Sequence, residues 1–329
     1  MAKTMTKKKS ANGVSLGTLA ALVVLCVLIA IASPNFLTFN NIMSVFKQTA
    51  FNAFVSVGML LCLITAGIEL SVGANAIFCS CLMGMMVQKG MTSGIAMVIV
   101  ALIAGTAIGL INGLLLTRLH LPHPFVSTLG MKNVLWGAAL LVTGSQMVSG
   151  FPEGATWFGS ATVGGFPVSF ICVILLYVGM HIFLTKTTLG RSIYCVGGNP
   201  EAARLSGINS ANVLTFCYTF SGLMAAIAGI VTTGRSGICN GTMAIQPYDT
   251  DAIAACIIGG ASFRGGKGTI WGTLIGALLI STIRNGLNLF GAGNDVQYIV
   301  IGLVIIVAVT IDVFRGKMEA KARKMAMAD

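Results

Sequence analysis

The stretch GIAMVIVALIAGTAIGLINGLLL, residues 94–116, decides the class of fold, because it contains no charged side chain over its whole length. The hydrocarbon core of a bilayer is about 30 Å thick and takes about 20 helical residues to cross. The stretch therefore predicts a helix that spans a membrane.

Similar apolar runs recur along the whole chain, which is 56% hydrophobic and only 9% charged. An ordinary soluble domain is about one quarter charged. The sequence therefore predicts an all-α polytopic membrane protein with about ten transmembrane helices. We expect the spans at 14–32, 42–66, 72–88, 94–116, 125–143, 166–184, 212–233, 250–263, 269–283 and 297–314.

The first run resembles a secretory signal, because basic residues precede it and Ala30-Ile31-Ala32 ends it. Its length and the many runs that follow favour a retained first helix.

The two ends of the chain are basic. The net charge is +11, and nine of the twenty Lys and Arg residues lie in the tails. Positive flanks orient membrane proteins with those flanks in the cytoplasm. We divide the chain into a basic cytoplasmic tail (1–13), a transmembrane domain (14–314) and a second basic cytoplasmic tail (315–329). An even number of crossings of a bacterial inner membrane fits this division.

Several other functions lack support in the sequence. The chain has no interior basic stripe with interleaved aromatic residues, so nucleic acid is not expected as a partner. Most of the nine cysteines lie inside apolar runs, no CxxC occurs, and the three histidines lack the spacing of a zinc site. We predict no metal site and no catalytic residues.

The loop after the sixth predicted span contains a short helix with clear start and stop signals. Asn199 is a good N-cap, and Pro200 and Glu201 suit the first helical turn. Gly207 supplies the stop. A helix of about two turns is unstable alone, so we expect the membrane face or a partner protein to hold it.

The residues of this loop resemble a known family. Glu201-Ala202-Ala203 with Gly207 resembles the EAA…G signature of ABC importer permeases. The run GRSIYCVGGNPEAARLSGI (190–208) is similar to the cytoplasmic loop of the ribose, xylose, arabinose and galactoside permeases. GIELSVG (67–73), DAIAA (251–255) with Gly259-Gly260, and NGLNL (285–289) resemble further motifs of that family.

The resemblance implies both a function and a set of partners. It implies the permease subunit of an ATP-driven importer for a pentose or hexose, not an enzyme. The implied partners are a second permease chain, an ATPase with two nucleotide-binding domains, an extracytoplasmic sugar-binding protein and membrane lipid. ATP and Mg²⁺ are expected in the ATPase, with no cofactor in this chain. The residues that would dock the ATPase are Asn199, Pro200, Glu201, Ala202, Ala203, Arg204 and Gly207.

A second group of polar residues lies in or beside the apolar runs and could contact substrate. It comprises Glu69, Ser71, Asn75, Asp249, Asp251, Asn285 and Asn288. Each also has a structural interpretation, because carboxylates stabilise helix starts and amides bond neighbouring helices. We favour the structural interpretation and keep the substrate contact as the alternative.

Two other functions have to be weighed. An ion-coupled secondary transporter needs carboxylates or unwound helices at mid-membrane, and Glu69 is the candidate for such a site. A membrane enzyme needs a cluster of acids, histidines or metal ligands, and the sequence offers only His120 and His123.

Overall fold

The computed structural model describes residues 12–119, 121 and 123–325. Most of the predicted tail 1–13 and residues 326–329 of the second tail lie outside this part of the chain. In the order of the sequence, the α-helices are α1 (Asn12–Ala32), α2 (Phe39–Ile64), α3 (Val72–Gln88), α4 (Gly94–Arg118), α5 (Pro124–Thr143), α6 (Glu153–Ser160), α7 (Val168–Lys186), α8 (Thr188–Gly198), α9 (Pro200–Leu205), α10 (Ser210–Ser236), α11 (Tyr248–Ile258), α12 (Ile270–Leu289) and α13 (Asn294–Met325).

The remaining regular structure is small. A 3-10 helix covers Gly241–Ile245, and four strands of two residues each form two antiparallel pairs. β1 (Val148–Ser149) pairs with β4 (Ile238–Cys239), with Val148 opposite Cys239. β2 (Thr162–Val163) pairs with β3 (Phe166–Pro167). The expected all-α polytopic class is therefore correct.

Each of the ten predicted apolar runs contains a helix, but the helices differ in length. Seven helices of the described chain are long and apolar enough to cross a membrane: α2, α4, α5, α7, α10, α12 and the Asn294–Phe314 part of α13. Helix α1 has 21 residues, α3 is shorter with 17, and α11 has only 11 residues. The number of complete crossings therefore stays a prediction.

Three predicted helix ends are wrong, and the largest difference is in α13, which continues to Met325 beyond the run expected at 297–314. The run expected at 250–263 ends its helix at Ile258, because Gly260 has a φ of 95° that no α-helix contains. The run expected at 269–283 continues as helix to Leu289, past Arg284, whose side chain is paired inside the bundle.

The centre of the bundle is α2, in which every residue from Ala50 to Ile64 is buried. It packs against α7, α10, α11 and α12. Helix α10 also packs closely on α4, where a methyl group on Gly109 would collide with the Tyr218 carbonyl oxygen. Gly105 and Gly113 approach α10 in the same way, so these glycines, spaced four residues apart, allow close helix packing.

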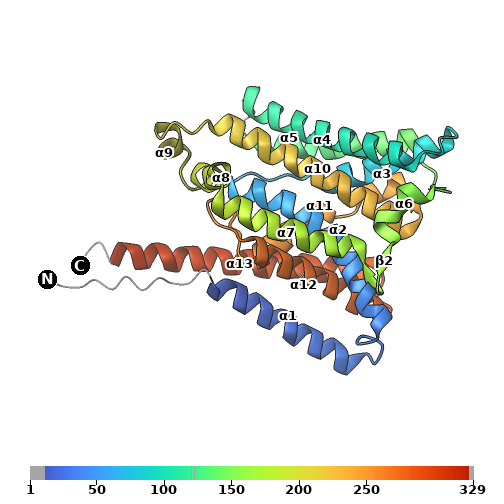
Figure 1. Ribbon diagram of the computed structural model, residues 1–329. Coiled ribbons are helices and arrows are strands. Elements are labelled where there is room, and N and C mark those ends of the chain that lie inside the picture. Colours follow the sequence, from blue (N-terminus) through green and yellow to red (C-terminus); the bar gives the residue numbers. More distant parts are fainter. Residues whose placement is uncertain (1–11, 120, 122, 326–329) are drawn as a thin grey trace.

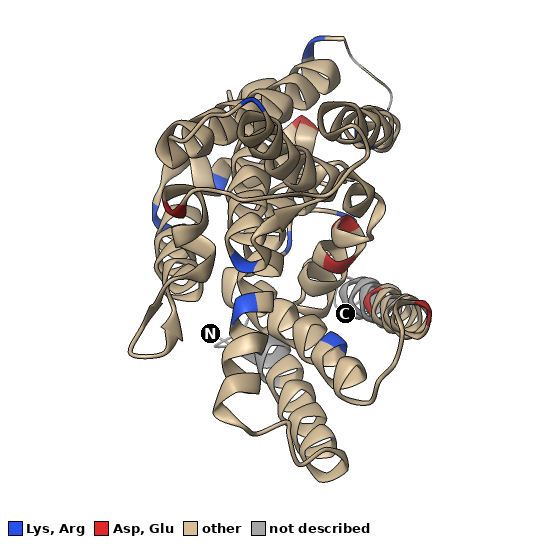
Figure 2. Ribbon diagram, turned by 90° about the vertical axis from the view of Figure 1, so that its right-hand side faces the viewer, with Lys and Arg blue, Asp and Glu red and all other residues tan. Residues whose placement is uncertain are grey.

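The bundle has two distinct ends (Figure 1). One end contains helices α8 and α9, together with the first described residues of α1 and the last described residues of α13. We call it the α9 end. Helix α6 and strand β2 lie at the opposite end, which we call the α6 end. Figure 2 views the bundle along its helices and shows that charged residues are sparse among the described ones.

Candidate functional site

The chain between α2 and α3 forms a non-helical segment inside the bundle. Ala66 has a φ of 60°, which ends α2, and Gly67 lies against the hydroxyl of Tyr218. Glu69 follows and is only 2% exposed. Backbone outside a helix is tolerated at membrane depth only where protein or a water-filled cavity satisfies its polar groups. The Glu69 carboxylate meets part of this requirement, because it accepts a hydrogen bond from the Ser71 backbone N–H.

The Glu69 carboxylate caps α3 and joins it to α4. One oxygen accepts hydrogen bonds from the Ser71 backbone N–H at 2.8 Å and from the Ser71 hydroxyl at 2.6 Å. The other oxygen accepts a bond from Asn112 Nδ2 at 3.0 Å. Asn75, one turn into α3, donates to the Gly105 carbonyl at 3.1 Å. These contacts agree with the structural interpretation of Glu69, Ser71 and Asn75.

Helix α11 begins with two buried carboxylates, and each has its own cation. The Lys132 ammonium of α5 lies 3.0 and 2.9 Å from the two oxygens of Asp249. The Arg284 guanidinium of α12 donates two bonds to Asp251, at 2.8 and 2.9 Å. Buried charges are stable only when they are paired in this way.

The polar network continues towards α13 and α2. Gln297 of α13 donates to the Asn288 side-chain oxygen at 2.7 Å. Asn285 and Asn41 exchange two amide hydrogen bonds at 2.8 and 3.0 Å, which tie α12 to the start of α2. All seven predicted polar residues therefore have partners within the chain.

The first turns of α3 and α11 meet inside the bundle. A methyl group on Gly73 would lie 2.9 Å from Tyr248 Cβ and 3.3 Å from the Asp249 nitrogen. The positive ends of two helix dipoles thus lie together, with Glu69, Asp249 and Asp251 beside them. Sequence reasoning missed Lys132, although a single lysine in the apolar run 125–143 indicates a buried partner.

The loop helix exists at the predicted place as α9. The Asn199 side chain accepts a hydrogen bond from the Ala202 N–H at 3.0 Å, and Gly207 adopts a φ of 80° after the helix end. Ala203 is buried against the protein, whereas Ala202 is exposed. Asn199, Pro200 and Gly207 thus have the capping roles that their residue types predict.

The outer surface of α9 combines a charged pair with an apolar side chain. Arg204 donates to Glu201 at 2.6 and 3.1 Å, and both side chains are exposed. The hydrogen bond from Arg204 lowers the pKa of the Glu201 carboxyl, so the pair stays ionised at neutral pH. Leu205 is 75% exposed. Its exposure could not be read from the local sequence.

Helix α8, which sequence reasoning also missed, connects α9 to both non-helical segments of the bundle. Gly197 packs so closely on the chain after α2 that a methyl group would collide with the Ile64 carbonyl oxygen. That oxygen accepts a hydrogen bond from the Gly266 N–H at 2.7 Å. The Tyr194 hydroxyl donates to the Gly268 carbonyl at 2.9 Å. A displacement of α8 would therefore act on the segments that lead into α3 and out of α11.

Comparison with known proteins agrees with this architecture. Residues 41–309 match the family described as "Branched-chain amino acid transport system / permease component". This chain belongs to that permease family. Since the match covers most of the molecule, the chain is a permease component and not an enzyme.

Members of this permease family with curated names resemble the chain over nearly its whole length. Ribose import permease protein RbsC of Escherichia coli K12 is 39% identical over 90% of this chain and 92% of its own length. D-allose transport system permease protein AlsC of the same organism is 37% identical over 90% of both chains. Galactose/methyl galactoside import permease protein MglC of Salmonella typhimurium LT2 is 34% identical over 90% of this chain and 93% of its own. No solved structure gives a significant match.

In the described part of the chain, no group of three or more His, Cys, Asp or Glu side chains is placed to hold a metal ion. Asp249 and Asp251 form neutral pairs with Lys132 and Arg284 between helices, whereas Glu69 bonds to the neutral Ser71 and Asn112.

Proposed function

We propose that this chain is the membrane-spanning permease subunit of an ATP-driven importer for a monosaccharide, either a pentose or a hexose. The observation that carries the proposal is the similarity, at 34 to 39% identity over 90% of the chain, to permeases named for ribose, D-allose and galactose. The family description names branched-chain amino acids. The named relatives favour a sugar.

The proposal places the α9 end in the cytoplasm and the α6 end outside the inner membrane. The ends of α1 and α13 share the α9 end with α8 and α9 (Figure 1), and Lys and Arg residues gather in the sequence before α1 and in residues 315–324 of α13. Ten crossings fit this arrangement if α1, α3 and α11 complete the seven full-length spans.

The proposed assembly contains two permease chains, an ATPase with two nucleotide-binding domains and an extracytoplasmic sugar-binding protein. ATP and Mg²⁺ belong to the ATPase. The exposed Leu205 and the exposed Glu201–Arg204 pair supply an apolar contact and charges for docking. A six-residue helix has little stability alone, so a partner that seats α9 also stabilises it.

In the proposed mechanism, ATP binding in the partner displaces α9 and α8. The contact of Gly197 with Ile64 and the Tyr194 bond to Gly268 transmit that displacement to the segments around α3 and α11. The two permease chains then open alternately to each side. The seven polar residues act mainly by holding the helices in register, and their direct contact with sugar remains the alternative role.

Reconstitution tests the proposal. Proteoliposomes that contain the permease, its ATPase and its binding protein should take up radiolabelled ribose, allose or galactose only when ATP is supplied to the ATPase side. Uptake that follows a Na⁺ or H⁺ gradient without ATP would support the ion-coupled transporter instead. Failure to transport any monosaccharide, together with uptake of leucine or valine, would assign a different substrate class.

A further inference from the structure

Two cysteines from distant parts of the sequence meet inside the bundle. Cys81 of α3 and Cys239 of β4 are free thiols in the structure, and their residues are 0% and 1% exposed. Both belong to one hydrophobic cluster, which also contains Val148 of β1. Their side chains are hydrogen-bond partners of each other. The two sulfur atoms are therefore neighbours.

The packing of Gly84 fixes the Cys239 sulfur against α3 independently of that bond. A methyl group on Gly84 would collide with Cys239 Sγ and would lie 3.4 Å from Val148 Cβ. Gly84 follows Cys81 by three residues, so both lie on the same side of α3. The register of the β1–β4 pair places Val148 opposite Cys239. The Cys239 sulfur is thus held between α3 and β1, on the side of α3 that carries Cys81.

This contact lies towards the α6 end of the bundle. Strand β4 directly follows α10, and a methyl group on Gly234 in the last turn of α10 would collide with the Thr156 carbonyl oxygen of α6. The start of α4, shortly after α3 ends, packs on α6 in the same way through Gly94. In the orientation proposed above, the α6 end faces the extracytoplasmic compartment. Disulfides form and persist there, whereas cytosolic thiols stay reduced.

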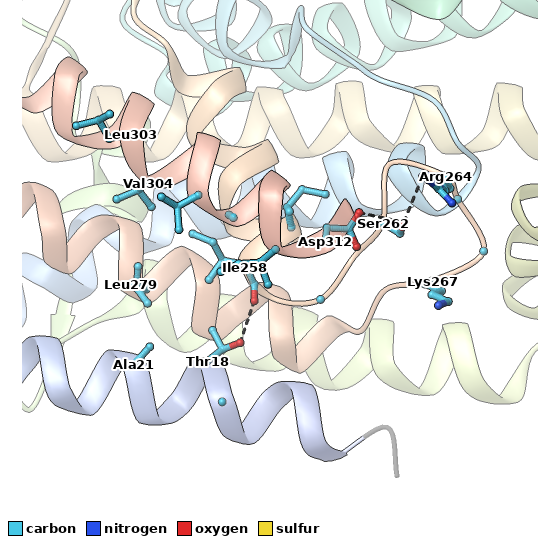
Figure 3. Close-up of a pocket in the computed structure, with 18 of the residues that line it drawn as sticks. Thr18, Ala21, Ile258, Ser262, Arg264, Lys267, Leu279, Leu303, Val304 and Asp312 are labelled. Carbon is cyan, nitrogen blue, oxygen red and sulfur yellow. Dashed lines mark hydrogen bonds between the residues drawn. The ribbon is translucent and has the colours of Figure 1, made fainter. Parts of the chain in front are cut away.

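Helix α11 has different surroundings at its two ends. Its last residues, Ile257 and Ile258, line a cavity of about 1110 Å³ between α1 and α13 (Figure 3). The end of α11 therefore has open space beside it. Its first residue, Tyr248, instead packs against the cluster that contains Cys81 and Cys239. A covalent tie within that cluster would fix the packed end of α11 and leave the end beside the cavity free to move.

We propose that Cys81 and Cys239 form a disulfide bond in the membrane-inserted protein, made by thiol–disulfide exchange with a protein disulfide of the extracytoplasmic compartment. The bond would join the β1–β4 pair to α3 beside the start of α11. The proposal rests on the orientation given above and on no feature of sugar transport.

The exchange proceeds in two steps. The Cys239 thiolate attacks one sulfur of the oxidoreductase disulfide, which forms a mixed disulfide and releases the other sulfur as a thiolate. The deprotonated Cys81 sulfur then attacks the Cys239 sulfur and releases the second oxidoreductase sulfur. The two cysteines lose two protons and two electrons, and the oxidoreductase takes up both as a dithiol.

Two features favour Cys239 as the first nucleophile. The hydrogen bond from Cys81 lowers the pKa of the Cys239 thiol, and the thiolate is the reactive form of cysteine. Strand β4 has two residues and pairs only with the two residues of β1. Such a short pair opens locally more easily than a core helix, which gives an oxidoreductase access to Cys239.

Counting free thiols in the full-length protein tests the bridge. Membranes from aerobically grown cells with an extracytoplasmic thiol oxidoreductase are denatured in the presence of N-ethylmaleimide, which blocks every free thiol. The adducts are then counted by intact mass spectrometry. The chain has nine cysteines. We expect seven adducts without reduction and nine when a reductant precedes the maleimide.

Serine variants locate the bridge. Cys81→Ser and Cys239→Ser each keep eight of the nine cysteines, and all eight should be labelled with or without reductant, because the remaining cysteine has lost its partner. Cys79→Ser is the matched control, since Cys79 lies on another side of α3 and donates to the Ala101 carbonyl at 3.4 Å. This variant should give six adducts without reductant and eight with it.

Thermal unfolding gives a second measurement. A bridge between residues far apart in the sequence stabilises a protein mainly by restricting the unfolded chain. Reductant should therefore lower the unfolding temperature of the wild-type protein and leave that of Cys81→Ser unchanged.

Nine adducts from the unreduced wild-type chain would overturn the proposal. Six adducts from unreduced Cys81→Ser would also overturn it, because they would assign the bridge to other cysteines. The assay contains neither ATP nor sugar, so its failure would leave the transport proposal intact. A failure of transport would in turn leave the count of seven adducts unchanged.

Discussion

Asp251 and Arg284 show why charged residues can occupy a chain with so few of them. The aspartate is 1% exposed, and the guanidinium meets it with two nearly parallel hydrogen bonds. This fork geometry is available to arginine and not to lysine. The pair lets α12 continue past Arg284 and fixes the start of α11 against it.

Removing one member of this pair should destabilise the protein. We expect Arg284→Ala to lower stability by about 3 to 5 kcal/mol, because it leaves a buried carboxylate without a partner. The double variant Asp251→Asn/Arg284→Gln should recover part of the loss. Thermal unfolding of the detergent-solubilised protein measures both. Arg204→Ala, which breaks an exposed pair, is the control and should change stability little. Equal effects of Arg284→Ala and Arg204→Ala would contradict the burial argument.

Two adjacent glycines offer a matched test of the contact between α8 and α2. Gly197→Ala drives a methyl group into the Ile64 carbonyl oxygen, whereas Gly198→Ala meets no atom within 4 Å. Overpacking of this kind costs about 1 to 3 kcal/mol. We expect Gly197→Ala to reduce thermal stability and ATP-driven uptake, while Gly198→Ala leaves both near the wild-type level. If the two variants behave alike, the close contact is not what links α8 to the bundle.

At the level of single residues, the sequence predicts the caps well and the partners poorly. Asn199 and Gly207 depend on neighbours in the chain, so their roles can be read from local sequence. Lys132 and Asp249 lie 117 residues apart. Only the fold reveals that pairing, although the burial of an isolated lysine indicates that a partner exists.

Among the elements, α9 has one side buried against the protein and the rest of its surface exposed. Ala203 faces the protein, whereas Glu201, Arg204 and Leu205 are exposed. A short helix with such a surface suits insertion into a groove of a partner. In the proposed mechanism, α8 carries the displacement of α9 inwards.

Charge reversal on α9 should break the docking. We expect Glu201→Lys/Arg204→Glu to keep the pair within α9 but to present the opposite charge pattern to the ATPase. Co-purification with the ATPase and ATP-driven uptake should both fall, because misplaced charges at an interface oppose association. The amount of folded permease should be unchanged, since both side chains are exposed. Unchanged association and uptake would remove α9 from the coupling mechanism.

Helix positions follow from the sequence more reliably than helix ends. The apolar runs locate ten helices because burial in lipid demands long stretches without charge. The end of α11 at Ile258 depends on the backbone of Gly260. Helix α8 escaped prediction because its residues 188–198 are only moderately apolar and contain three glycines. Its stability comes from packing on the bundle.

In the whole molecule, the non-helical segments after α2 and after α11 both meet α8 at the α9 end. Helices α3 and α11 themselves start inside the bundle. Force applied at one place can therefore reach both halves of the chain. The sequence predicts the orientation from the charges of its tails, but not that Ile64, Gly197 and Gly266 meet. That meeting joins three segments far apart in the chain.

The native cysteines offer a test of orientation. Cys195 of α8 is the exposed cysteine in the described chain, whereas the other eight are buried or intermediate. A membrane-impermeant maleimide should label inside-out vesicles strongly and intact spheroplasts weakly, and Cys195→Ser should abolish the difference. Stronger labelling of spheroplasts through Cys195 would reverse the proposed topology.

The central claim is that α9 is the contact through which an ATPase drives this permease. A photo-crosslinking amino acid at Leu205 tests it most directly in the assembled transporter, with the same substitution at the exposed Trp157 of α6 as the control. The account predicts a crosslink from position 205 to the ATPase and none from position 157. Crosslinks from position 205 to lipid or to the extracytoplasmic binding protein, with none to the ATPase, would contradict it.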